Sequence, residues 1–433
     1  MAGPKRVPLF PILLVNFIGT LGFSIVLPFL VTLVTRFGGN ALVYGAMGAT
    51  YSAFQLVGAP ILGRWSDVRG RRKILLLSQL GTLASWFVFL GAMFLPAVAL
   101  LEVDSPLMGS FMLTLPLVVL FGARALDGLT GGNVSVANAY LADVTDEDER
   151  NTNFGKMAVA GNLGFILGPA LAGLLGATAY GEVLPVLAAL LISLIASYVI
   201  AFHLPESNPC VLEAGPESTN LRKVFGQEQS DCFTIEDKVS FKDVLKLKGV
   251  AFLLVLYFVL FIGFNLFYAT FPVHALRGLN WTITDIGFFF SFLGVTTVIV
   301  QGPLLSRMGK KVPDVVLMLV GAAILAVSFV CFTSPSQAWL YTGAGLFSLG
   351  NGLMWPSFLA ILSRVAGTKY QGSVQGFGGS VGAAASILGL LLGGVLYESL
   401  RSSTFLVSAG CIAAVFLLGF RLLPLAKRTA PTR

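Results

Sequence analysis

Two charged residues stand inside an apolar stretch of the sequence, within the segment GARALDGLTGGN. Arg124 and Asp127 are three positions apart, so on a helix they share one face and can form an ion pair. An arginine at the centre of a membrane helix costs roughly 2.5–3.5 kcal/mol even on insertion-based scales, and it therefore usually faces a polar cavity. We predict that this pair transfers protons or binds substrate. The alternatives are a structural salt bridge near the membrane edge and an aspartic acid kept neutral by burial.

Small residues recur at regular spacing between residues 155 and 173, with the pattern G-x8-G-x3-G-P-x2-A-G. The members of this pattern are Gly155, Gly164, Gly168, Pro169, Ala172 and Gly173. Small residues three or four positions apart let membrane helices approach closely, and a proline inside a helix kinks it. The spacing therefore predicts a closely packed membrane helix, and packing alone is one interpretation of it.

Charged residues of both signs gather in two segments that border apolar runs. The segment GRWSDVRGRRK (63–73) contains Asp67, Arg71 and Arg72, and the segment YLADVTDEDER (140–150) contains Asp143 and Arg150. A run of charges is by default a solvated face, in which individual ion pairs contribute about 0–1 kcal/mol.

Six further polar or amphipathic residues fall within apolar runs, and they are candidates for the wall of a substrate cavity. They are Asn16, Gln55, Asn265, Tyr268, Asn351 and Trp355. A polar group that faces lipid costs free energy, so these side chains should point into the protein. Many of them will only bond neighbouring helices.

The elements that position these residues are predicted to be membrane helices. The chain has 433 residues, of which 56% are hydrophobic and 11% charged, whereas average soluble domains carry about 25% charged residues. Runs of about 20 apolar residues match the thickness of the bilayer hydrocarbon. The predicted runs are 9–35, 41–63, 74–96, 110–142, 153–177, 183–203, 249–272, 284–306, 313–333, 337–362, 371–397 and 402–424. We therefore predict an all-α membrane protein with twelve transmembrane helices.

Charge sets the expected orientation and location. Most of the 28 Lys and Arg residues fall in segments on one predicted side of the membrane, and cytoplasmic loops carry such an excess. We expect a multi-pass protein of the plasma (inner) membrane with both termini in the cytoplasm. The same distribution explains the net charge of +7 without nucleic acid as a partner.

The two halves of the chain repeat each other. The spacing of Gly155, Gly161 and Gly168 recurs at Gly376, Gly382 and Gly389. Residues 205–248 form the long polar stretch between the repeats, so we predict a six-helix bundle over 1–204, a cytoplasmic linker over 205–248 and a second six-helix bundle over 249–433. Internal repeats of membrane helices are typical of secondary transporters, whose substrate site lies between the repeats.

The motifs resemble those of the major facilitator superfamily, and within it the twelve-helix drug/proton antiporters that include the tetracycline exporters. The loop at 63–73 resembles the signature loop of that family, and the pattern from Gly155 to Gly173 resembles the antiporter motif of its fifth helix. Arg124 matches a further motif implicated in proton transfer. The chain departs from the family at Ala172, where a glycine is usual, and at Asp127, where glutamine is more common.

The resemblance implies the fold of two pseudo-symmetric six-helix bundles and a role for each group of residues. Asp67, Arg71, Arg72, Asp143 and Arg150 would form a charge network that stabilises one conformation. The protein would exchange protons for small amphipathic or apolar compounds, as in multidrug or tetracycline efflux. The tetracycline exporters carry an acid in the first helix at the position of Gly19, and this chain has none there.

Other functions stay open at this point. They are a lipid or glycolipid translocase of the same fold, a uniporter or symporter of small solutes, and a receptor without transport. The sequence contains no phosphate-binding loop, no metal-ligand cluster and no nucleophile with a base. We therefore predict that the protein is not an enzyme and needs no cofactor or metal. We also expect a monomer in the lipid bilayer that acts on a small-molecule substrate and protons.

Overall fold

The structure is a computed structural model that describes residues 9–106, 108–131, 133–145, 149–207, 245–247, 249–309 and 311–424. The first half of the chain forms helices α1 (Phe10–Ser24), α2 (Val26–Arg36), α3 (Ala41–Arg69), α4 (Arg71–Ala92), α5 (Leu115–Thr130), α6 (Asn133–Asp143), α7 (Arg150–Gly176) and α8 (Val183–His203). The second half forms α12 (Val250–Gly278), α13 (Ile283–Ile299), a π-helical turn (Val300–Leu304), α14 (Leu305–Met308), α15 (Asp314–Cys331), α16 (Gln337–Leu400) and α17 (Thr404–Gly419), with 3₁₀ turns at Arg401–Ser403 and Phe420–Leu422. Most of the predicted linker, residues 208–244 and 248, lies outside the described residues.

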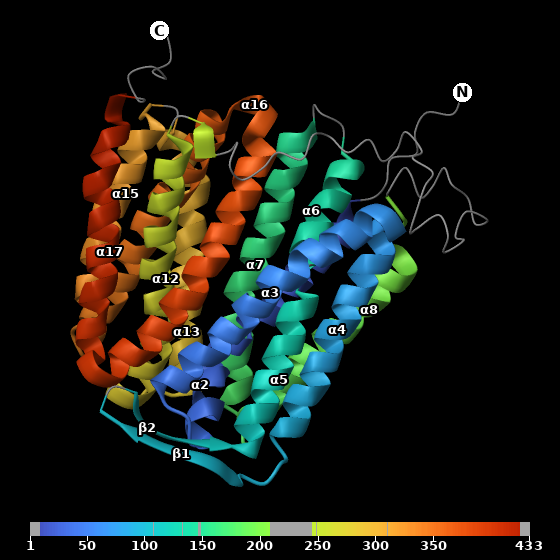
Figure 1. Cartoon of the computed structure of the whole chain (residues 1–433), viewed down its shortest axis with the longest axis vertical. Coiled ribbons are helices and arrows are strands. Elements are labelled where there is room, and N and C mark those ends of the chain that lie inside the picture. Colours follow the sequence, from blue (N-terminus) through green and yellow to red (C-terminus); the bar gives the residue numbers. More distant parts are fainter. Residues whose placement is uncertain are drawn as a thin grey trace.

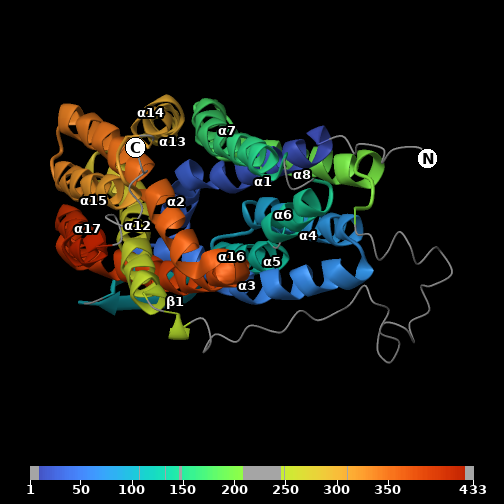
Figure 2. The ribbon, with the colours of Figure 1, turned by 90° about the horizontal axis from the view of Figure 1, so that it is seen from above.

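The helices form two bundles that stand side by side, one from each half of the chain (Figure 1, Figure 2). The bundles meet along two helix pairs, α3 with α16 and α7 with α13, on opposite sides of the boundary. Glycines permit both contacts, because a Cβ at Gly394 would lie 2.6 Å from the carbonyl oxygen of Ala41, and one at Gly173 would lie 3.3 Å from the Cα of Gly287. The backbones of the two bundles therefore touch directly along their boundary.

Ten stretches of the described residues are long and apolar enough to cross a membrane, compared with twelve predicted runs. The stretch Val374–Leu422 covers most of two predicted runs, 371–397 and 402–424. Helix α3 is the other difference: it forms a 29-residue helix over the predicted run 41–63, but Gly, Ser, Thr and Gln dilute its hydropathy. Among these residues, Gly45 and Gly58 face other helices and Ser52 and Gln55 face the cavity described below, so α3 spans the bundle without being strongly apolar.

Helix α16 is one continuous helical stretch that folds back on itself. Trp355 contacts Tyr257, with 5.5 Å between ring centroids, and a Cβ at Gly382 would lie 2.8 Å from the same Tyr257 ring. In a straight helix with a rise of 1.5 Å per residue, residues 355 and 382 would be about 40 Å apart. The ribbon therefore reverses between them, close to its label in Figure 1. The two arms of α16 correspond to the predicted runs 337–362 and 371–397.

A two-stranded antiparallel sheet connects α4 to α5, and the sequence did not predict it. Strand β1 (Ala99–Ser105) pairs with β2 (Gly109–Thr114), with Glu102 opposite Met112 and Asp104 opposite Ser110. The prediction of helix from residue 110 is wrong for its first residues, because β2 occupies 110–114 and α5 begins at Leu115. The hairpin lies across one end of the bundles (Figure 1).

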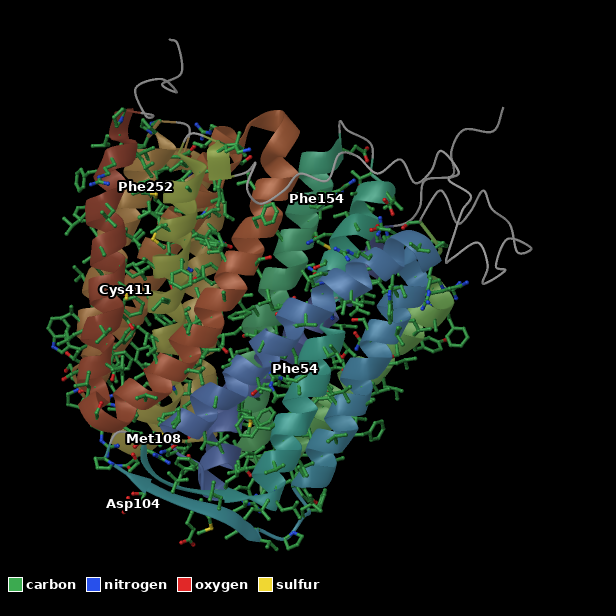
Figure 3. All side chains as sticks on the ribbon, viewed as in Figure 1. Phe54, Asp104, Met108, Phe154, Phe252 and Cys411 are labelled. Atoms are coloured by element: carbon green, nitrogen blue, oxygen red, sulfur yellow. The ribbon has the colours of Figure 1, made fainter. Side chains whose placement is uncertain are left out.

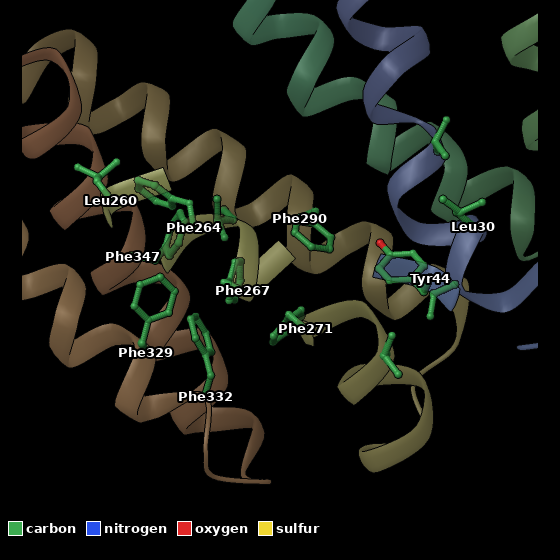
Figure 4. Packing of buried hydrophobic residues seen from close by; sticks show 14 of the residues in the cluster. Leu30, Tyr44, Leu260, Phe264, Phe267, Phe271, Phe290, Phe329, Phe332 and Phe347 are labelled. Carbon is green, nitrogen blue, oxygen red and sulfur yellow. The ribbon is translucent and has the colours of Figure 1, made fainter. Parts of the chain in front are cut away.

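The core of the second bundle is a cluster of phenylalanine rings (Figure 4). Phe267 lies at its centre, with ring centroids 5.0 Å from Phe332, 5.1 Å from Phe347 and 5.3 Å from Phe271. These rings are fully buried. Tilted and edge-to-face ring pairs contribute about 0.5–1.5 kcal/mol each beyond the area they bury. The cluster therefore joins α12 to α15 and α16 inside the second bundle.

Candidate functional site

A cavity of about 670 Å³ lies between the two bundles. Helices α1 to α8 and the α1–α2 junction supply one wall, and α12 with both arms of α16 supplies the other. Five of the six residues predicted to face a cavity line it: Gln55, Asn265, Tyr268, Asn351 and Trp355. The sixth, Asn16, lies outside it and borders a small adjoining void. Its amide donates to the carbonyl oxygen of Met157 on α7 at 2.9 Å, so it links two helices.

Arg124 and Asp127 both line this cavity and form an ion pair with each other. The Arg124 Nη1 atom donates to Asp127 Oδ2 at 2.9 Å, and the two residues are 5% and 9% exposed. The pair forms because α5 continues as regular helix through residues 124–127, which places them one turn apart. Among the described residues, the Arg124 Nε–H group has no hydrogen-bond acceptor. The pair is thus buried, mutually neutralising and incompletely satisfied.

Neighbouring helices hold the pair in place. The Arg124 guanidinium lies 4.4 Å from the centroid of the Tyr51 ring on α3, a distance suited to a cation–π interaction. Gln55 donates to the Tyr51 hydroxyl and to the carbonyl oxygen of Gly131, each at 3.1 Å. Thr82 on α4 hydrogen-bonds the Asp127 carboxylate. Three helices therefore fix the orientation of two charged side chains.

Small residues bring α3 and α5 close enough for these contacts. The backbone carbonyl of Leu129 would obstruct any side chain at Gly58, and the carbonyl of Tyr51 would obstruct one at Gly128. Residues larger than glycine would separate the two helices and move Tyr51 away from Arg124. Gly128, the residue after Asp127, is thus needed to keep Tyr51 close to the ion pair.

Aromatic residues make up half of the opposite wall of the cavity. Phe261 and Trp355 line it with ring centroids 5.4 Å apart, and Tyr257 stacks on Phe261 at 4.7 Å behind the wall. Asn265 also lines this wall, but its amide donates to the Ser386 hydroxyl at 2.9 Å and so joins α12 to α16. The cavity therefore has one wall with a charged pair and one wall suited to flat apolar groups.

The glycines of the α7 pattern differ in what they face: the first half of the first bundle, the second bundle, or open space. Gly164 and Gly168 face α1 and its junction with α2, where a Cβ at Gly164 would lie 2.5 Å from the carbonyl oxygen of Phe17. Gly173 faces α13 of the other bundle, and the carbonyl of Pro169, inside α7, contacts Gly287 there. A Cβ at Gly155 would meet nothing within 4 Å. Only part of the pattern is therefore explained by close packing.

The structure brings together three of the five residues of the predicted charge network. Arg71 pairs with Asp67, and its Nε atom donates to Asp143 Oδ2 at 3.0 Å. Arg72 instead donates to the backbone carbonyls of Ile200 and Ala201 near the end of α8. A positive charge there also interacts favourably with the helix macrodipole. The side chain of Arg150 lies outside the described residues.

Glu206 joins this network, and the sequence analysis placed it in the linker. Its carboxylate accepts hydrogen bonds from the backbone N–H groups of Arg71 at 2.8 Å and Arg72 at 3.2 Å, which begin α4. Gly70 makes room for it: its φ of 100° suits glycine, and any side chain there would meet the carboxylate. The sequence offered one signal for this contact: Glu206 is an acid shortly after the end of α8, and α4 begins with basic residues and no capping side chain.

Fold and cavity together define the class of protein: two bundles of membrane helices with a cavity between them form a secondary transporter. A model of the Major Facilitator Superfamily matches residues 12–389 and, in a second match, residues 253–433. The chain belongs to the Major Facilitator Superfamily. It is a multi-pass membrane transporter and not an enzyme.

Relatives of known name match nearly the whole chain. Tetracycline resistance protein, class C, of Escherichia coli is 26% identical over 383 residues, which cover 87% of this chain and 86% of that protein. Multidrug resistance protein 2 of Bacillus subtilis is 26% identical over 397 residues, which cover 90% and 89%. The chain is thus a distant full-length homologue of proteins named for tetracycline and multidrug resistance.

Solved structures confirm the predicted fold. The human organic anion transporter TETRAN superposes with a TM-score of 0.66 at 23% identity, covering 97% of this chain and 100% of that one. A D-xylose–proton symporter superposes with a TM-score of 0.74 at 14% identity, covering 96% and 98%. The fold is therefore the twelve-helix, two-bundle fold of the superfamily.

Proposed function

We propose that the protein is a proton-coupled antiporter that exports small amphipathic or apolar compounds by alternating access. The buried Arg124–Asp127 pair on the wall of the cavity between the bundles carries this proposal. Among the described residues that line the cavity, these two are the charged ones, so Asp127 is the available proton carrier. An ionisable pair inside a membrane protein is a functional site by default, because its burial is costly.

Competition between proton and substrate at Asp127 would provide the coupling. A hydrogen-bond donor of the substrate binds more strongly to the ionised carboxylate than to the protonated one, because a bound proton removes the negative charge and turns one carboxyl oxygen into a donor. Each ligand therefore weakens the binding of the other, which is the thermodynamic requirement for exchange. Arg124 would stabilise the ionised Asp127 carboxylate after the proton has left and before the substrate binds. The apolar part of the substrate would rest against Phe261 and Trp355 on the opposite wall.

The wider assignments follow from the same proposal. Both termini would lie in the cytoplasm, on the side of the network formed by Asp67, Arg71 and Asp143, and the protein would act as a monomer in the plasma (inner) membrane. The boundaries 1–204, 205–248 and 249–433 would separate bundle, linker and bundle. The names of the relatives support drug efflux as the physiological role, and tetracycline-like molecules as first candidates.

Proton flux in proteoliposomes tests the proposal. Vesicles with an imposed pH gradient would receive tetracycline, a neutral dye or a lipophilic cation, and an internal pH indicator would report proton movement. The wild type should show compound-triggered proton movement that Asp127→Asn abolishes. Asp104→Asn, which changes an exposed acid on the hairpin away from the cavity, is the matched control and should behave as wild type.

Four other outcomes would change the assignment. Compound movement without proton movement would favour the uniporter, and movement of fluorescent lipid analogues between leaflets would favour the lipid translocase. Proton and compound moving in the same direction would make the protein a symporter. Compound-triggered proton movement that survives Asp127→Asn would keep antiport and remove Asp127 from it.

A further inference from the structure

A carboxylate of the second bundle binds the start of a helix in the first. Glu398, near the end of α16, accepts a hydrogen bond from the backbone N–H of Ala41 at 2.8 Å. Ala41 is the first residue of α3, where the free N–H groups and the helix macrodipole favour negative charge. The Glu398 side chain is only 8% exposed. The Glu398 carboxylate is thus bound to the first bundle and largely shielded from bulk water.

Arg277, near the end of α12, completes the same contact. Its Nη1 atom donates to Glu398 Oε1 at 3.2 Å, and its Nη2 atom donates to the carbonyl oxygen of Gly39 at 2.8 Å. Glu398 and Arg277 therefore bind backbone groups of one short segment, residues 39–41. Both partners on the first bundle are main-chain atoms, so the recognition depends on the conformation of that segment.

The hairpin fixes the conformation of this segment. The backbone N–H of Met112 donates to the carbonyl oxygen of Gly38 at 2.9 Å, and the Thr114 hydroxyl donates to that of Phe37 at 2.8 Å. Asn40 donates to the carbonyl oxygen of Met108 at 2.8 Å and caps α3 by accepting from Val43. The segment is therefore held between the start of α3 and the hairpin.

The hairpin also reaches the second bundle. It belongs to the first half of the chain, yet a Cβ at Gly109 would lie 3.0 Å from Glu398 Oε2. Figure 3 places Met108 below the helices of the second bundle and Asp104 further out on the hairpin. Hairpin, segment 39–41, Glu398 and Arg277 thus form one layer across the boundary of the bundles, at the end away from the Arg71 network.

We propose that this layer is a latch that closes the cavity at the hairpin end, with Glu398 and Arg277 as its two releasable contacts. The other contacts between the bundles are close packing, such as Gly394 against Ala41, and hydrogen bonds between neutral groups, such as that from the Thr284 hydroxyl to the carbonyl oxygen of Gly173 at 3.0 Å. These contacts can part without leaving a charge buried. Glu398 and Arg277 make directional, charge-assisted bonds that must break together when this end opens. The energy difference between conformations of a transporter is a few kcal/mol, so two such bonds are sufficient to set the resting state. The latch does not depend on which substrate or ion the cavity carries.

Distances measured by double electron–electron resonance test the latch. Spin labels at Tyr180→Cys on the first bundle and Ser336→Cys on the second would report separation at the hairpin end in the purified full-length protein, after replacement of its four native cysteines. Loss of a hydrogen bond to a charged group typically changes an equilibrium by tenfold or more. Glu398→Gln should therefore raise the ratio of the long-distance to the short-distance population by roughly tenfold.

Three further variants make the test specific. Arg277→Gln should shift the populations in the same direction, and the double variant should add little, because both side chains act in one contact. Arg401→Gln is the matched control: Arg401 is exposed and its Nη1 atom lies 3.9 Å from Glu398, so the populations should not change. Wild-type populations in both Glu398→Gln and Arg277→Gln, in protein that elutes normally, would overturn the proposal. If one of the two variants fails to fold, the result of the other decides.

Discussion

Replacing Gly168 with alanine should destabilise the first bundle, because α7 crosses the α1–α2 junction there at backbone contact. A Cβ at residue 168 would lie 2.8 Å from the backbone nitrogen of Ile25 and 2.8 Å from the carbonyl oxygen of Leu21. Cβ atoms in proteins essentially never approach other heavy atoms within 3.0 Å. The Ser24 hydroxyl lies closer still and can rotate away, but these two neighbours are backbone atoms, so α7 itself must move. Overpacking of this kind costs about 1–3 kcal/mol.

Gly155 provides the matched control within the same sequence pattern. A Cβ there would meet nothing within 4 Å, so alanine fits without displacing any group. Alanine at an unobstructed helix position is more stable than glycine by about 0.5–1 kcal/mol. Both substitutions gain this helix propensity, so the overpacking at residue 168 sets the difference between the variants, about 1–3 kcal/mol in favour of Gly155→Ala.

The assay is the melting temperature of the purified protein in detergent, measured as the loss of monodisperse elution after heating. One kcal/mol corresponds to about 2–4 °C for domains of 150–250 residues, so Gly168→Ala should melt several degrees below wild type. Gly155→Ala should melt at or above the wild-type temperature. Equal melting temperatures for the two variants would refute the packing argument, and would leave both glycines to be explained by conformational change.

Three further substitutions test the site. Arg124→Lys keeps the charge but loses the planar group over Tyr51 and most of the donors, so vesicle transport should fall at least tenfold while the amount of folded protein is unchanged. Trp355→Ala removes an aromatic face from the apolar wall and should raise the Kd of an aromatic substrate severalfold, measured by equilibrium binding, with the binding of protons unaltered. Glu206→Gln removes a negative charge from the start of α4 and should lower stability by about 0.3–1 kcal/mol, with faster hydrogen exchange of the Arg71 and Arg72 amides; unchanged exchange would contradict this role.

The membrane spans were largely predictable because the bilayer imposes a length and a polarity on each helix. Helix α8 begins and ends where the apolar run 183–203 does. Helix α3 was also predicted, although its own hydropathy is modest, because charged or polar segments border it on both sides. The hairpin was not predicted, since its strands are short and show no clear alternation of buried and exposed residues.

The site was predictable only where sequence spacing determines contact. The Arg124–Asp127 pair follows from helical periodicity, and the free-energy cost of burying two charges in an apolar run marks it as a candidate site. Tyr51 and Thr82, which hold the pair, come from other helices and belong to residue types that are common in any membrane bundle. Arg72 could not be separated from Arg71 by sequence, because their partners depend on how α8 ends against α4.

The contacts at the hairpin end were beyond the reach of sequence. Glu398 and Arg277 bind backbone groups of residues 39–41. Every residue carries such groups, so the sequence does not show which residues are the partners. The separation of 357 positions between Glu398 and Ala41 excludes any argument from local periodicity. Such contacts arise from how two complete bundles meet, so only the assembled fold reveals them.

The central claim is that a proton gradient drives substrate through the cavity in the opposite direction. The most direct measurement is accumulation of labelled tetracycline in proteoliposomes under an imposed pH gradient, followed by the same experiment with the gradient reversed. The account predicts that tetracycline accumulates in the more acidic compartment, that accumulation changes sides when the gradient is reversed, and that Asp127→Asn shows neither effect. Accumulation on the alkaline side, or equal distribution under both gradients, would contradict it.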